Sequence, residues 1–469
     1  MSAILSSFAV STIKDTIVAL STPPGRSGIG VVRLSGTRAL EISQLLVRDE
    51  VFALEPNHAT LKKLYDPATG KVLDHALLTY FKSPHSFTGE DVVEFSCHGS
   101  PVLLRYLIDI ILSFDSRLAG PGEFTLRALR NGRLNLSQAE AIRDLINAQT
   151  KAAAQQATRQ LGGELSALLQ PIKDGLLNTI VPLESSLEFV EDDLPEVSIK
   201  EISATLFSLI NRIEEIASTF QTGRLLREGL KATLVGRPNV GKSSVFNKLI
   251  ASDRAIITDI PGTTRDSLSE MLTIEGVAIL LTDTAGLRVS ADVIENLGVE
   301  RTKRAIADAD LIILVIDGSQ PLMPEDIDIF KDISSGPHLI AVNKNDLEGF
   351  RLDALALREN KYNEARAIVS ISAKSGAGFD DLRSAIMKPF NVWDASDNGL
   401  FITNARHFDL LQRTQLALRS SADLLEARAS EELVLVGLYD ALRFLGEITG
   451  ETTTDDILSQ IFATFCIGK

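Results

Sequence analysis

The sequence predicts a multidomain protein that combines α/β and all-α parts, and three observations support this fold class. A glycine-rich segment, GRPNVGKSS (residues 236–244), lies between an apolar run and a helix-like stretch. Strand-like and helix-like patterns alternate from Lys231 to about Lys388, which is typical of an α/β domain. Long stretches on either side of that region repeat apolar residues at intervals of three and four, which indicates helices.

The N-terminal part, residues 1–119, is predicted to be a small α+β domain. Short β-branched runs at residues 29–34 and 92–95 mix with helical patterns. Cys97 and His98 follow the second run. One cysteine beside one histidine, with no second pair, favours packing at a strand end over a metal site.

Helices are predicted to dominate residues 120–222 and again residues 389–469. In the first part we expect Pro171, Pro182 and Pro195 to mark helix boundaries, because proline lacks a backbone donor and clashes with the preceding turn. In the second part the helical pattern covers residues 407–427 and 431–448. The simplest arrangement is a central helical bundle built from both parts, with residues 223–388 inserted between them as an α/β domain.

The glycine-rich segment has the features of a phosphate-binding P-loop. It follows the strand-like run at residues 232–235 and precedes a helix, so backbone N–H groups and the helix dipole would face the phosphates of a nucleotide. We expect Lys242 to contact the β- and γ-phosphates and the Ser243 hydroxyl to bind Mg²⁺. The alternative is a glycine-rich turn with a chance lysine.

Three later segments, each after an apolar run, extend this interpretation to a guanine nucleotide. The DTAG segment (283–286) would place a carboxylate near Mg²⁺ and a backbone N–H near the γ-phosphate. In NKND (343–346), an ionised Asp346 can accept from N1–H and the 2-amino group of guanine, whereas adenine lacks this donor pair. SAK (372–374) would support the same base. Together these motifs predict a Ras-like P-loop GTPase domain that selects GTP over ATP.

The switch region lacks the glutamine that orients water in Ras-like enzymes, because the residue after DTAG is Leu287. An apolar side chain cannot polarise water, so another acid or base and another positive charge are required. Glu295 is the candidate catalytic residue, with Asp292 as its competitor; a solvated loop acid is the alternative for either. Thr264 is predicted to complete the Mg²⁺ shell.

These motifs resemble one family over nearly the whole chain, from about Asp15 to Lys469. The segments GRPNVGKSS, TDIPGTTRD (258–266), DTAGLR and NKND are joined by the final FCIGK (465–469) and the early TPPGRSGIGVVRLSG (22–36). Together they are similar to the MnmE (TrmE) family of bacterial tRNA modification GTPases. The resemblance implies a GTP hydrolase with a folate-binding-like N-terminal domain, a helical bundle and an inserted GTPase domain.

The resemblance implies that K⁺ activates hydrolysis, since its charge would stand where an arginine finger lies in other GTPases. The residues expected to bind this ion are Asn239, Thr258, Ile260 and Thr263. Glu295 falls at the family's catalytic glutamate. The predicted nucleotide-binding residues are Asn239, Val240, Gly241, Lys242, Ser243, Ser244, Thr258, Asp259, Ile260, Pro261, Gly262, Thr263, Thr264, Asp283, Thr284, Ala285, Gly286, Asn343, Lys344, Asp346, Ser372, Ala373 and Lys374.

The resemblance also implies that the N-terminal domain contributes to dimerisation and binds a reduced folate similar to 5-formyl-tetrahydrofolate. The residues at the positions that hold it are Arg33, Glu94, Arg133 and the terminal Lys469. A carboxylate suits the pterin edge and arginines suit the glutamate tail of such a ligand, while a surface charge is the alternative for each residue. Cys466, close to this site by resemblance, is either a reactive thiol or a packing residue.

The implied reaction places an aminomethyl-type (carboxymethylaminomethyl) group at C5 of the wobble uridine, position 34, of certain tRNAs. The folate would donate one carbon. The implied partners are a second copy of the chain, an FAD- and NADH-dependent protein of the MnmG (GidA) type in a heterotetramer or larger complex, and tRNA. The alternatives are a ribosome-assembly GTPase without folate chemistry and a membrane-associated signalling protein, for which the sequence shows no anchor.

Composition is consistent with a cytoplasmic multidomain protein. The 469 residues allow about three domains, and the 2 cysteines are too few for a disulfide framework. The sequence contains no apolar stretch long enough to span a membrane. A net charge of -15 disfavours broad binding to nucleic acid, so contact with tRNA requires a local basic patch. Arg127, Arg130 and Arg133 are one candidate, and a solvated helix face is the alternative.

Overall fold

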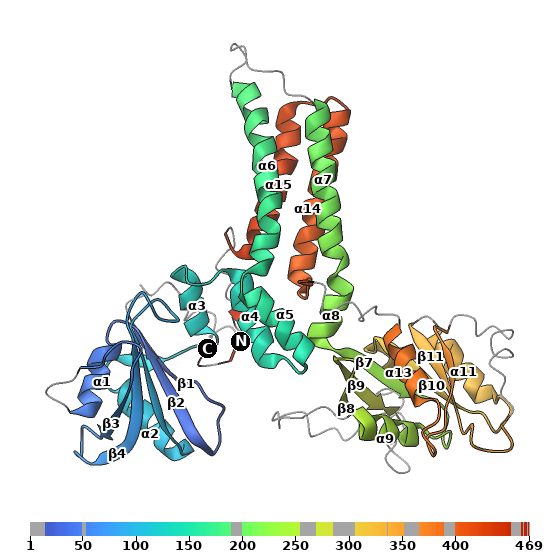
Figure 1. Cartoon of the computed structure of the whole chain (residues 1–469), viewed down its shortest axis with the longest axis horizontal. Coiled ribbons are helices and arrows are strands. Elements are labelled where there is room, and N and C mark those ends of the chain that lie inside the picture. The colour runs from blue at the N-terminus through green and yellow to red at the C-terminus, as the bar shows by residue number, and fades with distance from the viewer. Residues whose placement is uncertain are drawn as a thin grey trace, which may run out of the picture. The chain divides into compact units, whose positions relative to one another are not determined.

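A computed structural model describes most of the chain (Figure 1). The described residues are 15–48, 53–188, 199–253, 269–284, 305–334, 336–350, 365–388, 399–451, 461–462, 464–466 and 468. The chain divides into two compact units. The first comprises Met1–Arg143, Leu161–Ser166 and Leu445–Lys469, and the second comprises Asp144–Gln160 and Ala167–Phe444. The predicted domain division, with boundaries after residues 119, 222 and 388, stays a prediction.

In the described part of the first unit, six strands form one sheet with the order β3-β4-β5-β2-β1-β6 (Figure 1). The strands are β1 (Thr16–Leu20), β2 (Ser27–Ser35), β3 (Ala59–Tyr65), β4 (Val72–Phe81), β5 (Val92–Gly99) and β6 (Ser116–Leu118). Neighbouring strands are antiparallel except β1 and β6, which are parallel. The strands predicted at residues 29–34 and 92–95 are confirmed as parts of β2 and β5.

Alternation of side chains along the strands decides what each face of this sheet contacts. Val32 and Phe95 point to one face and belong to a buried core with residues of α1 (Ala39–Val47) and α2 (Pro101–Leu112). On the opposite face, Ile17 of β1 packs against Phe124 of α3 (Glu123–Arg130). The second face is therefore covered near β1 by α3, which also brings the segment after α3 close to the sheet.

The last described residues of the chain also pack within the first unit. A small core gathers residues of α4 (Leu136–Asn147) and of the chain end, namely Leu136, Ala139, Phe462 and Phe465. The backbone N–H of Gly122 donates to the carbonyl oxygen of Cys466 at 3.2 Å. The hydroxyl of Ser21 donates to the carbonyl oxygen of Gly468 at 3.1 Å. The chain end is thereby fastened beside β1 and the start of α3.

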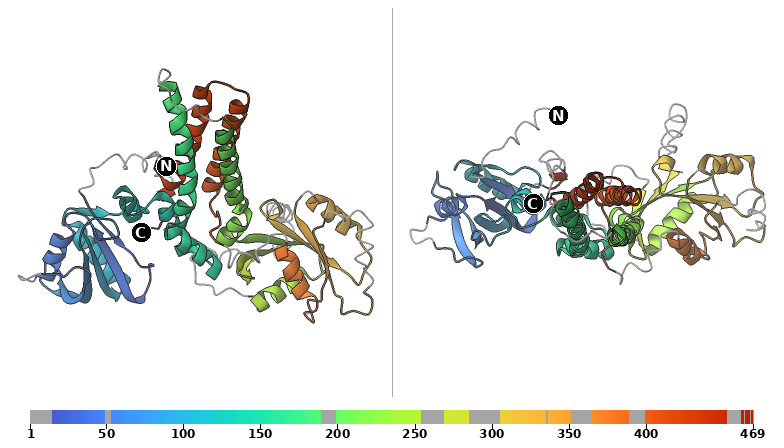
Figure 2. Two further views of the ribbon diagram at one scale, coloured as in Figure 1. Left: turned by 45° about the horizontal axis from the view of Figure 1, so that its top comes forward. Right: turned by 90° about the horizontal axis from the view of Figure 1, so that it is seen from above.

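Four long helices run side by side in Figures 1 and 2 and form the helical bundle. They are α6 (Glu164–Glu188), α7 (Ile199–Ser218), α14 (Ala405–Glu426) and α15 (Glu431–Thr449). Shorter helices are α5 (Lys151–Leu161) and α8 (Phe220–Glu228), and Phe220 of α8 stacks on Phe408 of α14 with ring centroids 4.3 Å apart. The helices predicted at residues 407–427 and 431–448 are confirmed as α14 and α15.

The prediction that Pro171 and Pro182 mark helix boundaries is wrong, because α6 continues through both. Both prolines are exposed. The opposite side of the helix carries an apolar stripe at helical spacing, formed by the buried residues Leu165, Leu169, Ile172, Leu176, Ile180 and Leu183. Burial of these side chains, at about 1.5 to 3 kcal/mol each, outweighs a cost of about 3 kcal/mol for each interior proline. Pro195 lies outside the described residues.

The second unit also contains the α/β domain, whose described strands have the order β12-β11-β10-β7-β9-β8 (Figure 1). The strands are β7 (Leu230–Val235), β8 (Ser269–Ile274), β9 (Val277–Asp283), β10 (Leu311–Asp317), β11 (His338–Asn343) and β12 (Ile368–Ser370). Only β8 runs antiparallel to its neighbour among these strands. The described helices of the domain are α9 (Lys242–Asp253), α11 (Pro324–Ile333) and α13 (Phe379–Met387).

Parallel strands covered on both faces require continuous apolar runs, and every residue of β10 and β11 is buried. The strand-like run at 232–235 corresponds to β7, and the apolar runs noted before the DTAG, NKND and SAK segments correspond to β9, β11 and β12. A parallel sheet with the glycine-rich loop between a central strand and α9 confirms the Ras-like P-loop domain. None of the described helices combines the length and apolarity needed to cross a membrane.

Candidate functional site

The glycine-rich loop joins β7 to α9, and two of its glycines stand where a side chain would not fit. A Cβ at Gly236 would lie 2.4 Å from the carbonyl oxygen of Val315, and one at Gly241 would lie 2.3 Å from Nδ2 of Asn343. Both glycines have positive φ, 147° and 99°. The ammonium group of Lys242 lies 2.8 Å from the carbonyl oxygen of Gly236. The loop thus holds a cation where a P-loop binds phosphate.

The ends of β7 and β9 bring together oxygen atoms suited to Mg²⁺. The two strands are parallel, with Leu234 opposite Asp283, and the hydroxyl of Ser243 donates to Oδ2 of Asp283 at 2.8 Å. Hydroxyl and carboxylate oxygens, with phosphate oxygens and water, are the ligands that Mg²⁺ prefers. The Thr284 hydroxyl instead donates to the carbonyl oxygen of Leu234 at 2.7 Å, so it fastens the two strands. The described residues contain no group of three or more His, Cys, Asp or Glu that could hold a metal alone.

Asn343 and Asp346, at the end of β11, connect the P-loop to the SAK segment. Nδ2 of Asn343 donates to the carbonyl oxygen of Val240 at 2.9 Å, and its Oδ1 accepts from the N–H of Ala373 at 3.0 Å. Oδ1 of Asp346 accepts from the hydroxyl of Ser372 at 2.7 Å. This hydrogen bond lowers the pKa of Asp346, whose carboxylate is exposed. An ionised, accessible carboxylate is the acceptor that guanine recognition requires.

Asp317 is a site residue that the sequence analysis missed. Its Oδ2 accepts from the ammonium group of Lys344 at 2.6 Å, and its Oδ1 accepts from the hydroxyl of Ser319. Burial alone would raise the pKa of Asp317, but the hydrogen bonds from Lys344 and Ser319 leave it lowered. Asp317 ends the apolar strand β10 just as Asp283 ends β9, so its position at a strand end was a signal for it.

Several predicted residues lie outside the part of the chain that the structure describes. They are Thr258, Asp259, Ile260, Pro261, Gly262, Thr263, Thr264, Ala285, Gly286, Asp292, Glu295 and Lys469. Their roles stay predictions. Asn239, Ser244 and Lys374 are described and are exposed at the same edge of the sheet, and Asn239 has a φ of 65°.

In the first unit, Arg33 and Glu94 form an ion pair across β2 and β5. They are partners in the strand register, and Nε and Nη2 of Arg33 lie 2.8 and 2.7 Å from Oε1 of Glu94. Nη1 of Arg33 also contacts the carbonyl oxygen of Gly468 at 3.4 Å. The guanidinium also lies over the rings of Phe87 and Phe124, whose centroids are 5.8 and 5.7 Å from Cζ. The chain end, two strands and two aromatic rings therefore meet at Arg33.

Arg133 lies beside residues 82–91, between β4 and β5. A Cβ at Gly89 would lie 3.3 Å from Cγ of Arg133, so Arg133 packs against the loop that carries Phe87. The basic patch considered for tRNA is not supported, because Arg127 is buried and Arg133 lies beyond the end of α3.

Cys97 and His98 at the end of β5 have different surroundings. Cys97 is buried, and burial, together with the charge of Asp74, raises the pKa of its thiol to about 12. The imidazole of His98 is exposed, and its Nδ1 lies 2.7 Å from Oδ1 of Asp74. The predicted packing role therefore describes Cys97 but not His98.

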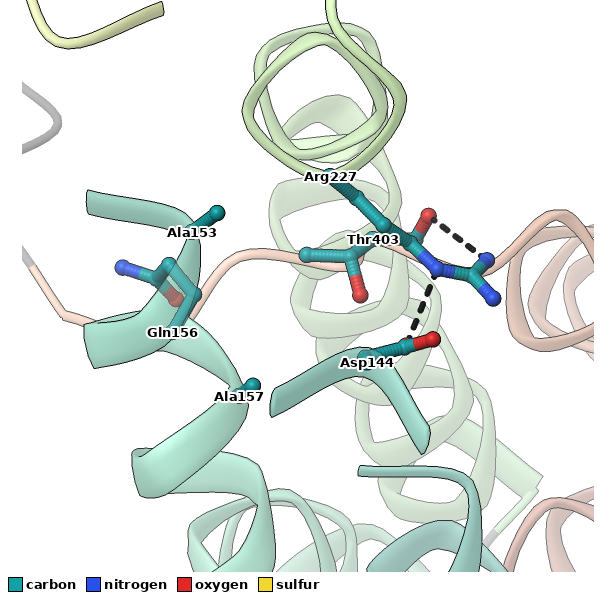
Figure 3. Close-up of a pocket in the computed structure, with 6 residues that line it drawn as sticks. All are labelled: Asp144, Ala153, Gln156, Ala157, Arg227 and Thr403. Atoms are coloured by element: carbon teal, nitrogen blue, oxygen red, sulfur yellow. Dashed lines mark hydrogen bonds and ion pairs between the residues drawn. The ribbon is translucent and has the colours of Figure 1, made fainter. Parts of the chain in front are cut away.

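Within the second unit, two segments connect the α/β domain to the helices, and they lie side by side. They are α8, which precedes β7, and residues 399–404 after α13. The N–H of Ile402 donates to the Thr219 hydroxyl at 3.0 Å. Nε2 of Gln156, in α5, donates to the carbonyl oxygen of Gly399, and Oε1 of Gln156 accepts from the N–H of Phe401, each at 3.1 Å. A small pocket beside them (Figure 3) is lined by Asp144, Ala153, Gln156, Ala157, Arg227 and Thr403.

The Ras-like sheet, the P-loop after β7 and the guanine-binding segments after β11 and β12 define a P-loop GTPase. Comparison with known families makes the class more specific. The family profile described as MnmE helical domain matches residues 136–466, and the profile described as GTP-binding protein TrmE N-terminus matches residues 16–133. The chain belongs to the MnmE family.

Relatives match along their whole length. Proteins named tRNA modification GTPase MnmE from Koribacter versatilis and Aquifex aeolicus are 43% and 42% identical, over 97% of this chain and 100% of each relative. A crystal structure of an Aquifex aeolicus Era variant bound to GDP.AlF4- is 27% identical over 40% of this chain and 66% of that chain, with a TM-score of 0.29. Because this score is low, the fold assignment depends on strand order and loop geometry.

Proposed function

We propose that this chain is a K⁺-activated GTPase that acts in tRNA modification. With an FAD- and NADH-dependent partner it installs an aminomethyl-type (carboxymethylaminomethyl) group at C5 of the wobble uridine, position 34, and a reduced folate donates the one-carbon unit. The observation that carries the proposal is that one chain combines a guanine-nucleotide site with a separate charged site around Arg33 and Glu94. Relatives of full length, named tRNA modification GTPases, support it.

Activation by K⁺ is implied by the resemblance to the MnmE family, and it would answer a deficit in the switch segment. Leu287 cannot orient water. The P-loop supplies the charge of Lys242, whereas its arginine, Arg237, is paired with Asp326. A monovalent cation beside the phosphates would supply the missing positive charge in the transition state. The exposed position of Asn239 in the P-loop supports its role as one ligand, with Mg²⁺ bound separately at Ser243 and Thr264.

The decisive experiment compares GTP hydrolysis in K⁺ and Na⁺ buffers for the wild type, Glu295→Ala and the control Asp292→Ala. We expect strong stimulation by K⁺ and a loss of roughly 100-fold or more in Glu295→Ala, the size typical of a lost general acid or base. GTP binding should be unchanged in both variants. Equal rates in the two salts would remove the cation from the mechanism, and full activity of Glu295→Ala would remove the glutamate.

The residues around Arg33 fit a reduced folate in chemical type. Both contacts of Arg33 use Oε1 of Glu94, and Oε2 is the acceptor that we expect to face donors of the pterin. Arg133 suits the carboxylates of the glutamate tail. The rings of Phe87 and Phe124 offer flat apolar surface. When bound, the folate supplies the one-carbon unit, and these side chains bind and orient it.

Self-association is part of the proposal, and the N-terminal sheet supports it. Leu61 and Leu77 are partners across β3 and β4 on the face opposite α1 and α2, and they are 65% and 44% exposed. Neighbouring exposed leucines on a sheet face are typical of a protein interface, and a second copy is the simplest occupant. A partner of the MnmG type and tRNA complete the proposed cytoplasmic assembly.

A further inference from the structure

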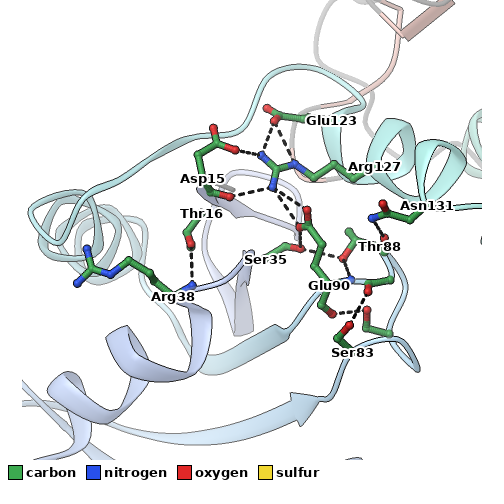
Figure 4. Close-up of polar contacts among 12 residues, drawn as sticks. Asp15, Thr16, Ser35, Arg38, Ser83, Thr88, Glu90, Glu123, Arg127 and Asn131 are labelled. Carbon is green, nitrogen blue, oxygen red and sulfur yellow. Dashed lines mark hydrogen bonds and ion pairs between the residues drawn. The ribbon is translucent and has the colours of Figure 1, made fainter. Parts of the chain in front are cut away.

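A cluster of charged side chains ties together distant parts of the first unit, and Figure 4 shows the members that surround Arg127. Its members are Asp15, Glu90, Arg117, Glu123 and Arg127. Arg127 of α3 is 5% exposed. Its Nη2 donates to Asp15 Oδ1 at 2.7 Å and to Glu123 Oε1 at 2.9 Å, and its Nη1 lies 3.1 Å from both carboxylate oxygens of Glu90. One guanidinium thus joins the residue before β1, the loop before β5 and α3.

Arg117 shares two of these carboxylates but not the third. Its Nε donates to Asp15 Oδ2 and its Nη2 to Glu123 Oε1, each at 2.6 Å. The contacts of Arg117 in the described structure do not include Glu90. Both arginines therefore stabilise the cluster, but only Arg127 also holds Glu90. Comparing the two arginines can distinguish these roles.

Glu90 anchors the loop between β4 and β5, residues 82–91. The hydroxyl of Ser35, in β2, donates to Oε2 of Glu90 at 2.7 Å and lies 2.8 Å from the hydroxyl of Thr88. Nδ2 of Asn131, just after α3, donates to the carbonyl oxygen of Thr88 at 2.7 Å. These bonds fasten the loop to β2 on one side and to the end of α3 on the other.

The anchored loop forms one wall of the site around Arg33. Phe87 of the loop and Phe124 of α3 both lie against the Arg33 guanidinium. Gly89 of the same loop packs against Arg133. A shift of the loop relative to α3 would therefore change the spacing of the two rings and the position of Arg133 together.

We propose that Arg127 is a positioning residue for the ligand site at Arg33. Through Glu90 it fixes the loop 82–91 against α3, and so sets the separation of the aromatic rings and the place of Arg133. Arg127 itself does not touch the ligand. The inference rests on the proposed folate function, because it concerns the shape of that site.

The choice of arginine follows from the number of acceptors. A planar guanidinium presents five N–H donors and can serve three carboxylates at once, whereas an ammonium group is a point charge with three donors. Without this guanidinium, Glu90 would keep a largely buried charge with no ion-pair partner in the described part of the chain. Because an uncompensated buried charge is strongly unfavourable, the loop is expected to move Glu90 toward water.

The test compares Arg127→Met with the matched control Arg117→Met. Both variants lose ion pairs to Asp15 and Glu123, but only the first loses the pair to Glu90. Binding of 5-formyltetrahydrofolate is measured by calorimetry, and amide hydrogen exchange is measured in residues 83–91, below the unfolding temperature of each variant. We expect faster exchange and roughly tenfold or greater loss of affinity in Arg127→Met, the size typical of a lost outer-shell contact. Arg117→Met should stay near wild type, and GTP hydrolysis should be unchanged in both.

Equal losses of affinity in the two variants, or unchanged exchange in Arg127→Met, would overturn the proposal. If Arg127→Met does not fold, Glu90→Gln carries the same comparison, because its amide can keep the hydrogen bond from Ser35 while losing the charge. Absence of folate binding by the wild-type protein would refute the folate function instead. The exchange data would still decide whether Arg127 fixes the loop.

Discussion

At the scale of single residues, Asp346 determines which base the nucleotide site accepts. The hydrogen bond from Ser372 lowers the pKa of Asp346, so the carboxylate is ionised at neutral pH and base selection is lost only as pH falls through that lowered pKa. Asp346→Asn is expected to weaken GTP binding by roughly 100-fold or more and to favour xanthosine triphosphate, whose 2-carbonyl accepts from the amide. Competition between the two nucleotides measures this switch.

The matched control for Asp346→Asn is Glu348→Gln, the same change of acid to amide two residues further along, at another exposed position. It should leave the preference for GTP intact. An unaltered preference in Asp346→Asn itself would show that another group recognises the base.

The two cysteines are expected to differ in reactivity toward a thiol reagent such as DTNB. The thiolate is the reactive form, and burial raises the pKa of Cys97 to about 12, whereas Cys466 is exposed. Native protein should therefore react rapidly at one thiol, and protein unfolded in guanidinium at both. Cys466→Ser should abolish the rapid reaction. Rapid reaction of native Cys466→Ser would contradict the burial of Cys97.

At the scale of elements, α6 contains two interior prolines that its packing tolerates. Pro171 is exposed, so alanine would restore a backbone hydrogen bond without disturbing the buried stripe. Pro171→Ala is expected to stabilise the helical region by roughly 1 to 3 kcal/mol, seen as a higher urea midpoint in far-UV circular dichroism. Pro324→Ala is the control, because proline at the first position of α11 costs nothing there. A lower midpoint for Pro171→Ala would show that α6 requires the proline.

Sequence patterns predicted the elements in which local and tertiary signals agree. The run at 232–235 and the apolar run before NKND correspond to β7 and β11, since strands covered on both faces need continuous apolar residues. In α6 the local signal of Pro171 and the apolar stripe disagree, and burial decides the outcome. Local patterns carry less information wherever two such signals compete.

Local sequence patterns also reveal only some residues of the candidate sites. The P-loop and NKND segments are local motifs, so their residues could be found in the sequence, and Asp317 could have been found by its place at a strand end. The role of Arg127 could not be found in the sequence, because its spacing with Arg130 and Arg133 is the same as that of a solvated helix face. Its partners Asp15 and Glu90 lie 112 and 37 positions away, and no local pattern reveals them.

At the scale of the whole molecule, two connecting segments, α8 and residues 399–404, join the nucleotide domain to the helices. Gln156 of α5 forms hydrogen bonds with the backbone of the second segment, at Gly399 and Phe401. Gln156→Leu is expected to leave GTP hydrolysis near wild type and to lower tRNA modification by roughly 2- to 30-fold, the size of typical coupling changes. Modified uridine in tRNA from cells that carry each variant measures the effect.

Gln415→Leu on α14 is the control for this substitution, because Gln415 bonds Glu214 on the exposed side of the bundle, away from the connecting segments. It should leave both activities unchanged. An equal loss of hydrolysis and modification in Gln156→Leu would place its effect in the GTPase domain itself.

The hydrogen bond between Ser21 and Gly468 spans 447 positions of the chain. A ribosome adding about 5 to 20 residues per second would release the second partner roughly 20 to 90 seconds after the first. Until residue 468 has emerged, the surface around Arg33 therefore lacks the carbonyl oxygen that contacts this guanidinium. An affinity tag is therefore better placed away from Gly468.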